Sequence, residues 1–134
     1  FIFVNYNVTQ VINTVSGIGI GFNNGTALIT TEGTTATAGH SRIVAKGDAA
    51  AQTTFILDKI AAALEALGAS IKDIVRTRIY LVNVEDTLAV SKAHGRVFGQ
   101  IKPANTLLQV GGLVGDYLVE IEADALIRNN NSLN

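Results

Sequence analysis

The sequence predicts one α+β domain in which two helices cover one face of a mixed sheet. The chain has 134 residues, of which 48% are hydrophobic. This suits a single compact domain with a core, spanning residues 1–134, and leaves little room for a second domain. The apolar pattern predicts strands, then a helix, a strand, a second helix and further strands. That order favours helices packed on one side of a sheet.

The N-terminal third predicts strands joined by a turn. Residues 8–22 alternate loosely between apolar and polar side chains, and residues 22–26 (Phe-Asn-Asn-Gly-Thr) carry a strong turn signal. Residues 27–31 are expected to form a short strand. The small residues of 33–47 then predict a flexible loop, which is a plain connector unless a ligand uses it.

The clearest element is a helix that begins after Asp48 and ends at Gly68. Asp48 is a suitable N-cap, the Ala-rich stretch has high helix propensity, and Gly68 supplies the C-terminal stop. Apolar residues at helical spacing predict the buried stripe: Ile56, Ile60, Ala63, Leu64 and Leu67. The opposite side is expected to be solvated: Gln52, Asp58, Lys59 and Glu65.

The second half predicts a strand, a helix and two more strands. The strand is expected over residues 74–81, the helix over 87–99, and the later strands over 107–110 and 118–127. A period of two places Val75, Thr77, Ile79 and Leu81 on one face, and Arg76, Arg78 and Tyr80 on the other. The second helix is expected to turn Val90, Ala93 and Val97 inward. The tail, residues 129–134, is expected to fray.

Charged side chains recur on the outward face of two predicted strands. They are Arg76 and Arg78 on the first, and Glu120, Glu122 and Asp124 on the last. A lone domain would expose these charges to water. An oligomer would instead close several such faces together and pair Arg with Glu across strands. The pattern alone fits both arrangements.

Composition excludes several classes of function. The net charge of −1 gives no basic excess for phosphates, so nucleic acid is not an expected partner. Cysteine is absent, which removes disulfides and thiolate chemistry, and two histidines, His40 and His94, do not suggest a metal site. No apolar run approaches 18 residues, and the start lacks a signal-peptide pattern. We therefore expect a cytoplasmic protein with no cofactor, no metal and no membrane contact.

Several motifs from residue 47 onward together resemble the Rid (YjgF-type) family. The segments that carry the resemblance are residues 47–53 (Gly-Asp-Ala-Ala-Ala-Gln-Thr), 68–70 (Gly-Ala-Ser), 75–78 (Val-Arg-Thr-Arg), 93–99 (Ala-His-Gly-Arg-Val-Phe-Gly), 102–106 (Lys-Pro-Ala-Asn-Thr) and 119–125 (Val-Glu-Ile-Glu-Ala-Asp-Ala). The first 20 residues match only weakly.

The resemblance implies a chorismate-mutase-like fold and a homotrimer whose three clefts lie between neighbouring subunits. Characterised relatives hydrolyse reactive enamines and imines to carbonyl compounds and ammonia. In them an Arg after the Pro-Ala pair clamps the substrate carboxylate. The first Glu of the Glu-Ile-Glu strand, here Glu120, helps to position or activate water. A loop glycine, which maps onto Gly33, supplies backbone contacts, and the neighbouring Thr34 is counted with it as substrate-binding.

This chain departs from the family pattern where the Arg would stand, because that position is Asn105. Arg presents a charged planar fork that matches a carboxylate, whereas Asn presents a neutral amide. Hydrogen bonds to charged groups contribute about 1.5–3 kcal/mol against about 1 kcal/mol for neutral ones. The change is therefore expected to cost one or two powers of ten in affinity for a carboxylate substrate, on the order of 1.4 kcal/mol for each.

The roles of four further residues stay open on sequence grounds. Glu32 stands next to Gly33, so it either joins Glu120 as a second carboxylate in the cleft or points to solvent. His94 either moves protons near neutral pH or is simply packed and hydrogen-bonded. Arg78 either pairs with Glu120 or, like Arg96, brings a positive charge to Asn105 from a neighbouring subunit.

Two functions follow from these expectations. The first is a hydrolytic deaminase with Glu120 and His94 as catalytic residues, acting on an enamine or imine that is not held by an Arg clamp. Its substrate-binding residues would be Asn105, Gly33, Glu32, Thr34 and Arg78. The second is a non-catalytic trimer that binds a small molecule in the same cleft.

Overall fold

The computed structural model describes residues 10–13, 18–23 and 26–128, with side chains for residues 28–127. Among these residues, six strands form the main sheet in the order β1-β2-β3-β8-β6-β7. Their bounds are β1 Gln10–Asn13, β2 Ile18–Asn23, β3 Thr26–Thr31, β6 Ile74–Leu81, β7 Ala104–Gln109 and β8 Val119–Arg128. Strands β6 and β7 run parallel, whereas the other neighbours run antiparallel.

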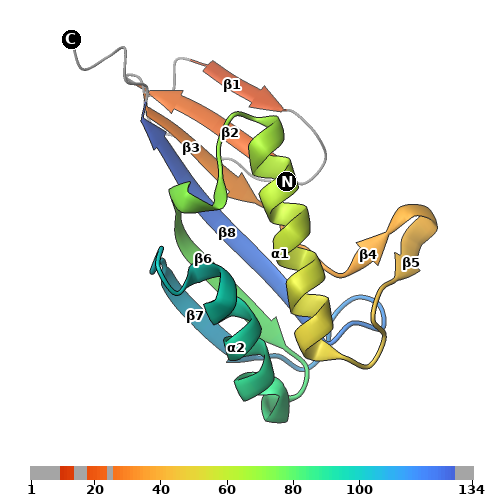
Figure 1. Cartoon of the computed structure of the whole chain (residues 1–134). Coiled ribbons are helices and arrows are strands. Elements are labelled where there is room, and N and C mark those ends of the chain that lie inside the picture. Colours follow the sequence, from red (N-terminus) through yellow and green to blue (C-terminus); the bar gives the residue numbers. More distant parts are fainter. Residues whose placement is uncertain (1–9, 14–17, 24–25, 129–134) are drawn as a thin grey trace.

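Two helices, α1 (Ala49–Ala66) and α2 (Thr87–Phe98), cover one face of this sheet (Figure 1). The predicted α+β class and the placement of both helices on one face are confirmed. The predicted strand over 74–81 has its expected bounds, and the other predicted elements begin or end within three residues of theirs. The central residues of the predicted turn, 24–25, and the tail, 129–134, lie outside the described residues.

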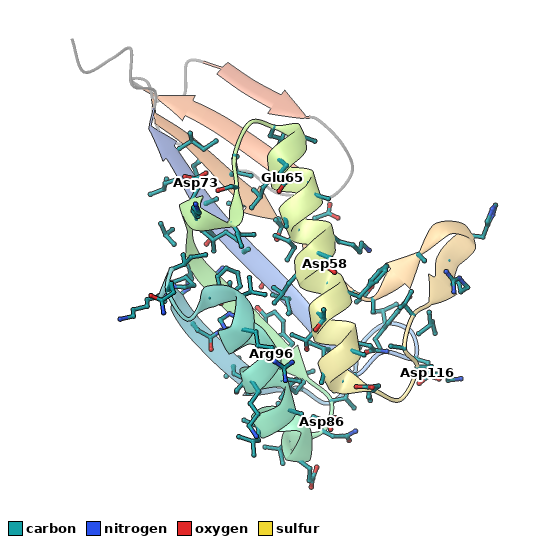
Figure 2. All side chains as sticks on the ribbon, in the orientation of Figure 1. Asp58, Glu65, Asp73, Asp86, Arg96 and Asp116 are labelled. Atoms are coloured by element: carbon teal, nitrogen blue, oxygen red, sulfur yellow. The ribbon has the colours of Figure 1, made fainter. Side chains whose placement is uncertain are left out.

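Helix α1 begins and ends as the sequence predicts. The side chain of Asp48 accepts a hydrogen bond from the Ala51 amide at 2.9 Å, which caps the helix. Gly68 adopts a positive φ of 80°, a conformation that favours glycine and stops the helix. Ile56, Ile60 and Leu64 are buried against the sheet, while Asp58 and Glu65 are exposed (Figure 2).

Two residues expected on the solvated side of α1 instead anchor loops. Gln52 is fully buried: its Oε1 accepts from the Leu118 amide at 3.0 Å, and its Nε2 donates to the Val44 carbonyl at 3.3 Å. Lys59 is half-buried and donates to the carbonyls of Thr35 and Thr37 at 3.1 and 3.0 Å. The prediction was wrong for Gln52 and for Lys59 because buried backbone carbonyls and amides need partners.

Strand β6 differs from its prediction at one residue. Val75 is 45% exposed, although Thr77, Ile79 and Leu81 are buried as expected. The pairing of β6 with β8 shifts register between Ile74 and Arg76, so an extra residue enters the strand. Such a bulge breaks the period of two, and Ile74 is buried in place of Val75.

The loop that follows β3 is held firmly in place. Thr34 and Ile121 exchange two backbone hydrogen bonds, at 2.8 and 3.0 Å, which ties the loop to β8. Beyond it, two short strands, β4 (Thr37–Ala38) and β5 (Arg42–Ile43), pair with one another and project to the side of the sheet (Figure 1). The loop therefore does more than connect, since it fixes Gly33 against the end of β8.

None of the helices in the described part of the chain combines the length and apolar character that a membrane crossing requires. Within the same residues, no three His, Asp or Glu side chains gather in a way that would hold a metal ion.

Candidate functional site

An open pocket of about 320 Å³ lies on the side of the sheet away from the helices. Its lining comes from the loop after β3, from β6 and β8, and from the glycine-rich segment after β7. The lining residues are Gly33, Tyr80, Val110, Gly112, Leu113, Glu120 and Glu122. Two of the residues expected at the site, Gly33 and Glu120, are thus brought together. The described lining carries two carboxylates and no basic side chain.

The carboxyl group of Glu120 lies directly against Gly33. A Cβ atom added at Gly33 would stand 2.6 Å from Glu120 Oε2 and 2.7 Å from Glu120 Cδ. These distances are shorter than van der Waals contact, so the Glu120 carboxyl group would have to move. The φ of Gly33 is outside the left-handed region, so the backbone itself does not require glycine there. Glycine at this position therefore leaves open the space that the Glu120 carboxyl group occupies.

Burial and a nearby charge both act on Glu120. Removal from water raises the pKa of its carboxyl group, and the charge of Glu122 raises this pKa further. Glu122 itself accepts a hydrogen bond from the Tyr80 hydroxyl, which raises the pKa of Tyr80. The pocket thus holds two different carboxyl groups: one that protonates more readily than usual and one that a phenol holds as an acceptor.

The arginines of β6 lie on the same open face but are engaged elsewhere. Arg78 Nη1 lies 3.3 Å from Asp124 Oδ2, so this arginine pairs with Asp124 rather than with Glu120. Arg76 Nη2 donates to Thr106 Oγ1 at 3.2 Å. Arg96 lies exposed on α2, on the helix side of the sheet (Figure 2).

Asn105 lies on the other face of the sheet. In the parallel pairing of β6 and β7 it stands beside Thr77, whose side chain faces the helices, whereas Glu120 stands opposite Tyr80 on the open face. Asn105 Nδ2 lies 2.9 Å from Thr77 Oγ1. A single chain therefore does not bring Asn105 to the Glu120 pocket.

His94 also lies on the helix side. Its Nε2 is 2.9 Å from Thr77 Oγ1, and its ring packs against Phe98 with centroids 4.6 Å apart. Burial lowers the pKa of His94, which favours the neutral ring. Within one chain the sheet separates His94 from Glu120, and its catalytic role stays a prediction.

The remaining expected residues flank the pocket without lining it. Glu32 is exposed, and its backbone carbonyl accepts a hydrogen bond from Thr34 Oγ1 at 3.1 Å. Tyr80 and Glu122 line the pocket although they were not expected at the site. Glu122 lies two residues after Glu120 on β8, and Tyr80 lies directly opposite Glu120 on β6. Side chains on one face of neighbouring strands lie close together, so their shared outward face was the signal that could have placed them at the site.

A helix-covered mixed sheet with a carboxylate-lined pocket on its open face describes a small α+β domain suited to a small molecule. Residues 21–127 match the family model described as Endoribonuclease L-PSP. The chain belongs to this family, which includes the Rid (YjgF-type) proteins, and the resemblance found in the sequence is confirmed.

Curated relatives and solved structures agree with this placement. A RutC family protein of Pyrococcus horikoshii is 38% identical over 61% of this chain and 65% of its own length. The 3-aminoacrylate deaminase RutC of Acinetobacter baylyi is 36% identical over 62% of this chain and 66% of its own. The alignments thus span slightly less than two thirds of these relatives.

Among solved structures, a YjgF-family protein of Mycobacterium tuberculosis is 36% identical, with a TM-score of 0.66 over 77% of this chain and 85% of that one. A Rid protein of Yersinia pestis is 28% identical, with a TM-score of 0.73 over 90% of this chain and 94% of that one.

Proposed function

We propose that the protein hydrolyses an enamine or imine to a carbonyl compound and ammonia. Its preferred substrate would differ from the imino acids whose carboxylate is held by an Arg. The observation that carries this proposal is the Glu120 carboxyl group, which has a raised pKa and lies against Gly33 in an open pocket. Similarity to a 3-aminoacrylate deaminase supports the reaction class.

Glu120 would carry protons between water and the leaving nitrogen. An enamine first tautomerises to an imine by moving a proton from nitrogen to carbon. Water then adds to the C=N carbon, forming a C–O bond while one proton passes to the Glu120 carboxylate. The carboxyl group returns that proton to nitrogen. The hydroxyl proton of the resulting carbinolamine then passes to nitrogen as the C–N bond breaks, so that ammonia leaves and the carbonyl forms. A carboxyl group with a raised pKa suits both steps, because general acid–base catalysis works best when the pKa approaches the working pH.

The substrate preference would follow from the charges around the site. The described lining holds Glu120 and Glu122 but no Lys or Arg, and Asn105 carries no charge. A substrate that offers an amine or another neutral polar group fits these residues better than a simple imino acid does. Ribonuclease activity, which the family's description names, is not expected of this chain, because a net charge of −1 gives no basic excess for binding a nucleic acid.

The complete site would need more than one chain. Glu120 and Gly33 face the open side of the sheet, whereas Asn105 lies on the helix side at the edge strand β7. A homotrimer with clefts between subunits would bring Asn105 of one chain beside the pocket of its neighbour. Light scattering coupled to size-exclusion chromatography tests the assembly, and the expected mass is three times 14.1 kDa.

Ammonia release from a panel of freshly generated imines and enamines tests the activity. The panel should include 3-aminoacrylate and neutral amides of imino acids. We expect release above the spontaneous rate for at least one member, and loss of that excess in Glu120→Gln. Glu65→Gln, an exposed change on α1, is the matched control and should keep full activity. No release above background from any member would overturn the proposal.

Asn105 also supports a second candidate, a trimer that binds a small molecule without turning it over. In that case the pocket would still bind a small molecule but would no longer catalyse its hydrolysis. Native mass spectrometry of the purified protein would reveal a retained metabolite. A retained metabolite that survives long incubation unchanged favours this candidate, whereas ammonia release excludes it.

A further inference from the structure

Three side chains form a continuous hydrogen-bonded chain from α2 to the sheet edge. Thr77 Oγ1 lies 2.9 Å from His94 Nε2 on one side and 2.9 Å from Asn105 Nδ2 on the other. Thr77 has no exposed surface, whereas Asn105 is exposed at the edge strand β7. The buried hydroxyl therefore connects a half-buried imidazole to an amide that a ligand can reach.

The direction of these hydrogen bonds follows from counting protons. Asn105 Nδ2 also lies 3.5 Å from the Thr77 backbone carbonyl, and a carbonyl oxygen can only accept. The amide nitrogen must therefore face β6, and it donates to Thr77 Oγ1. The hydroxyl oxygen can accept two hydrogen bonds but carries a single proton. Because Thr77 is fully buried, that proton needs an acceptor, and the other partner among the described residues is His94 Nε2. His94 then accepts at Nε2 and carries its own proton at Nδ1. Burial lowers the pKa of His94, which favours this neutral form.

We propose that Thr77 and His94 fix the Asn105 amide with its oxygen outward, so that the edge of β7 accepts hydrogen bonds and selects a ligand group that donates them. Such a group is a primary amine, an amide N–H or a hydroxyl, and not a carboxylate. The inference rests on the proposed function in that it assigns the exposed side of Asn105 to that site. Asn105 contacts the ligand, and Thr77 is a positioning residue.

The consequence is a reversal of polarity at this position. An amide free to rotate would present its NH₂ group to a carboxylate and its oxygen to an amine. With the amide nitrogen held inward, Asn105 presents only its oxygen to a ligand. A carboxylate oxygen facing that amide oxygen would bring two acceptors together with no hydrogen between them, so a carboxylate is disfavoured. A site that leaves a polar group unpaired in this way discriminates by about tenfold or more between otherwise equal ligands.

The tautomer of His94 tests the direction of the hydrogen bonds without any enzyme assay. Long-range ¹H–¹⁵N NMR on the full chain distinguishes a protonated Nδ1 from a protonated Nε2, and His40→Gln leaves His94 as the single histidine. We expect a proton on Nδ1 at neutral pH. A proton on Nε2 would mean that Thr77 donates to the Asn105 oxygen, so that the NH₂ group faces outward, and this would overturn the proposal.

Binding of pyruvamide and pyruvate tests the selectivity, because the two ligands differ in whether the group beside the ketone donates hydrogen bonds. Titration calorimetry should show pyruvamide bound about tenfold or more tightly. Thr77→Val removes the hydroxyl but keeps the 3.5 Å contact of the amide with the backbone carbonyl, so it should lower the ratio, and Thr77→Ser should restore it. Equal affinities in the unaltered protein, or tighter pyruvate, would refute the proposal. Neither experiment needs turnover, so both decide the question even if no deaminase activity is found.

Discussion

Gly33→Ala changes the position of one carboxyl group while leaving the fold intact. The added Cβ would stand 2.6 Å from Glu120 Oε2, where ordinary contacts begin at 3.4 Å, so the carboxyl group must retreat by about 0.8 Å. The obstructing atoms are the far end of a flexible side chain, and the φ of Gly33 is outside the left-handed region. The protein should therefore tolerate alanine by moving Glu120 rather than by shifting its backbone.

The magnitude follows from the size of that displacement. Moving a catalytic group by about 1 Å costs on the order of 10²-fold in rate. A retreat of about 0.8 Å should accordingly lower kcat by about 10- to 100-fold with little change in KM. The free energy of unfolding should change by no more than about 1 kcal/mol, because alanine restricts the unfolded chain as it crowds the native one.

Steady-state ammonia release and urea denaturation measure the two effects on one protein preparation. Gly39→Ala is the matched control, because a Cβ there meets nothing within 4 Å and its φ is also outside the left-handed region. The control should keep both activity and stability. Full activity in Gly33→Ala, with the Glu120 carboxyl group shown by crystallography to have moved, would refute the link between its position and catalysis.

Three further changes test other parts of the account. Glu120→Gln should raise Tm at pH 7 and leave it unchanged at pH 4. The reason is that a carboxyl group with a raised pKa makes the native state less stable as the pH rises through that pKa. Thermal denaturation at both pH values measures the effect. Burial lowers the pKa of His94, so stability should fall as pH drops below 6.5, where the unfolded chain protonates first, and His94→Gln should flatten this slope in urea titrations. Ile79→Ala should cost about 2–5 kcal/mol and Val75→Ala no more than about 0.5 kcal/mol; equal costs would contradict the bulge in β6.

Much of the fold could be predicted because local signals and the global arrangement agree. The Asp48 cap, the Gly68 stop and the stripe of Ile56, Ile60 and Leu64 depend on residues near one another in the chain. The same is true of the alternation along β8. Such features are decided within a few residues, so a sequence pattern states them directly.

The errors arose where distant segments decide the outcome. Gln52 is polar and looked solvated, yet the Leu118 amide, 66 residues away, requires its oxygen. Val75 fits the alternation of its strand, but the register shift opposite β8 turns it outward. No local pattern reports either the partner of a buried amide or the register between two strands.

The candidate site could be predicted only in part for the same reason. Glu120 and Gly33 are 87 positions apart, and the family resemblance placed them in one site. Tyr80 and Glu122 join them through strand pairing, which the sequence indicates by their shared face but does not fix. The connection of Asn105 to His94 through Thr77 depends on the packing of α2 on the sheet, and it could be found only from the structure.

The most direct test of the central claim is ammonia release by the unaltered protein and by Glu120→Gln, measured side by side on 3-aminoacrylate and on a neutral amide of an imino acid. We predict release above the spontaneous rate for the unaltered protein, with the neutral amide preferred, and only the spontaneous rate for the variant. Equal rates for the two proteins on both compounds would contradict it.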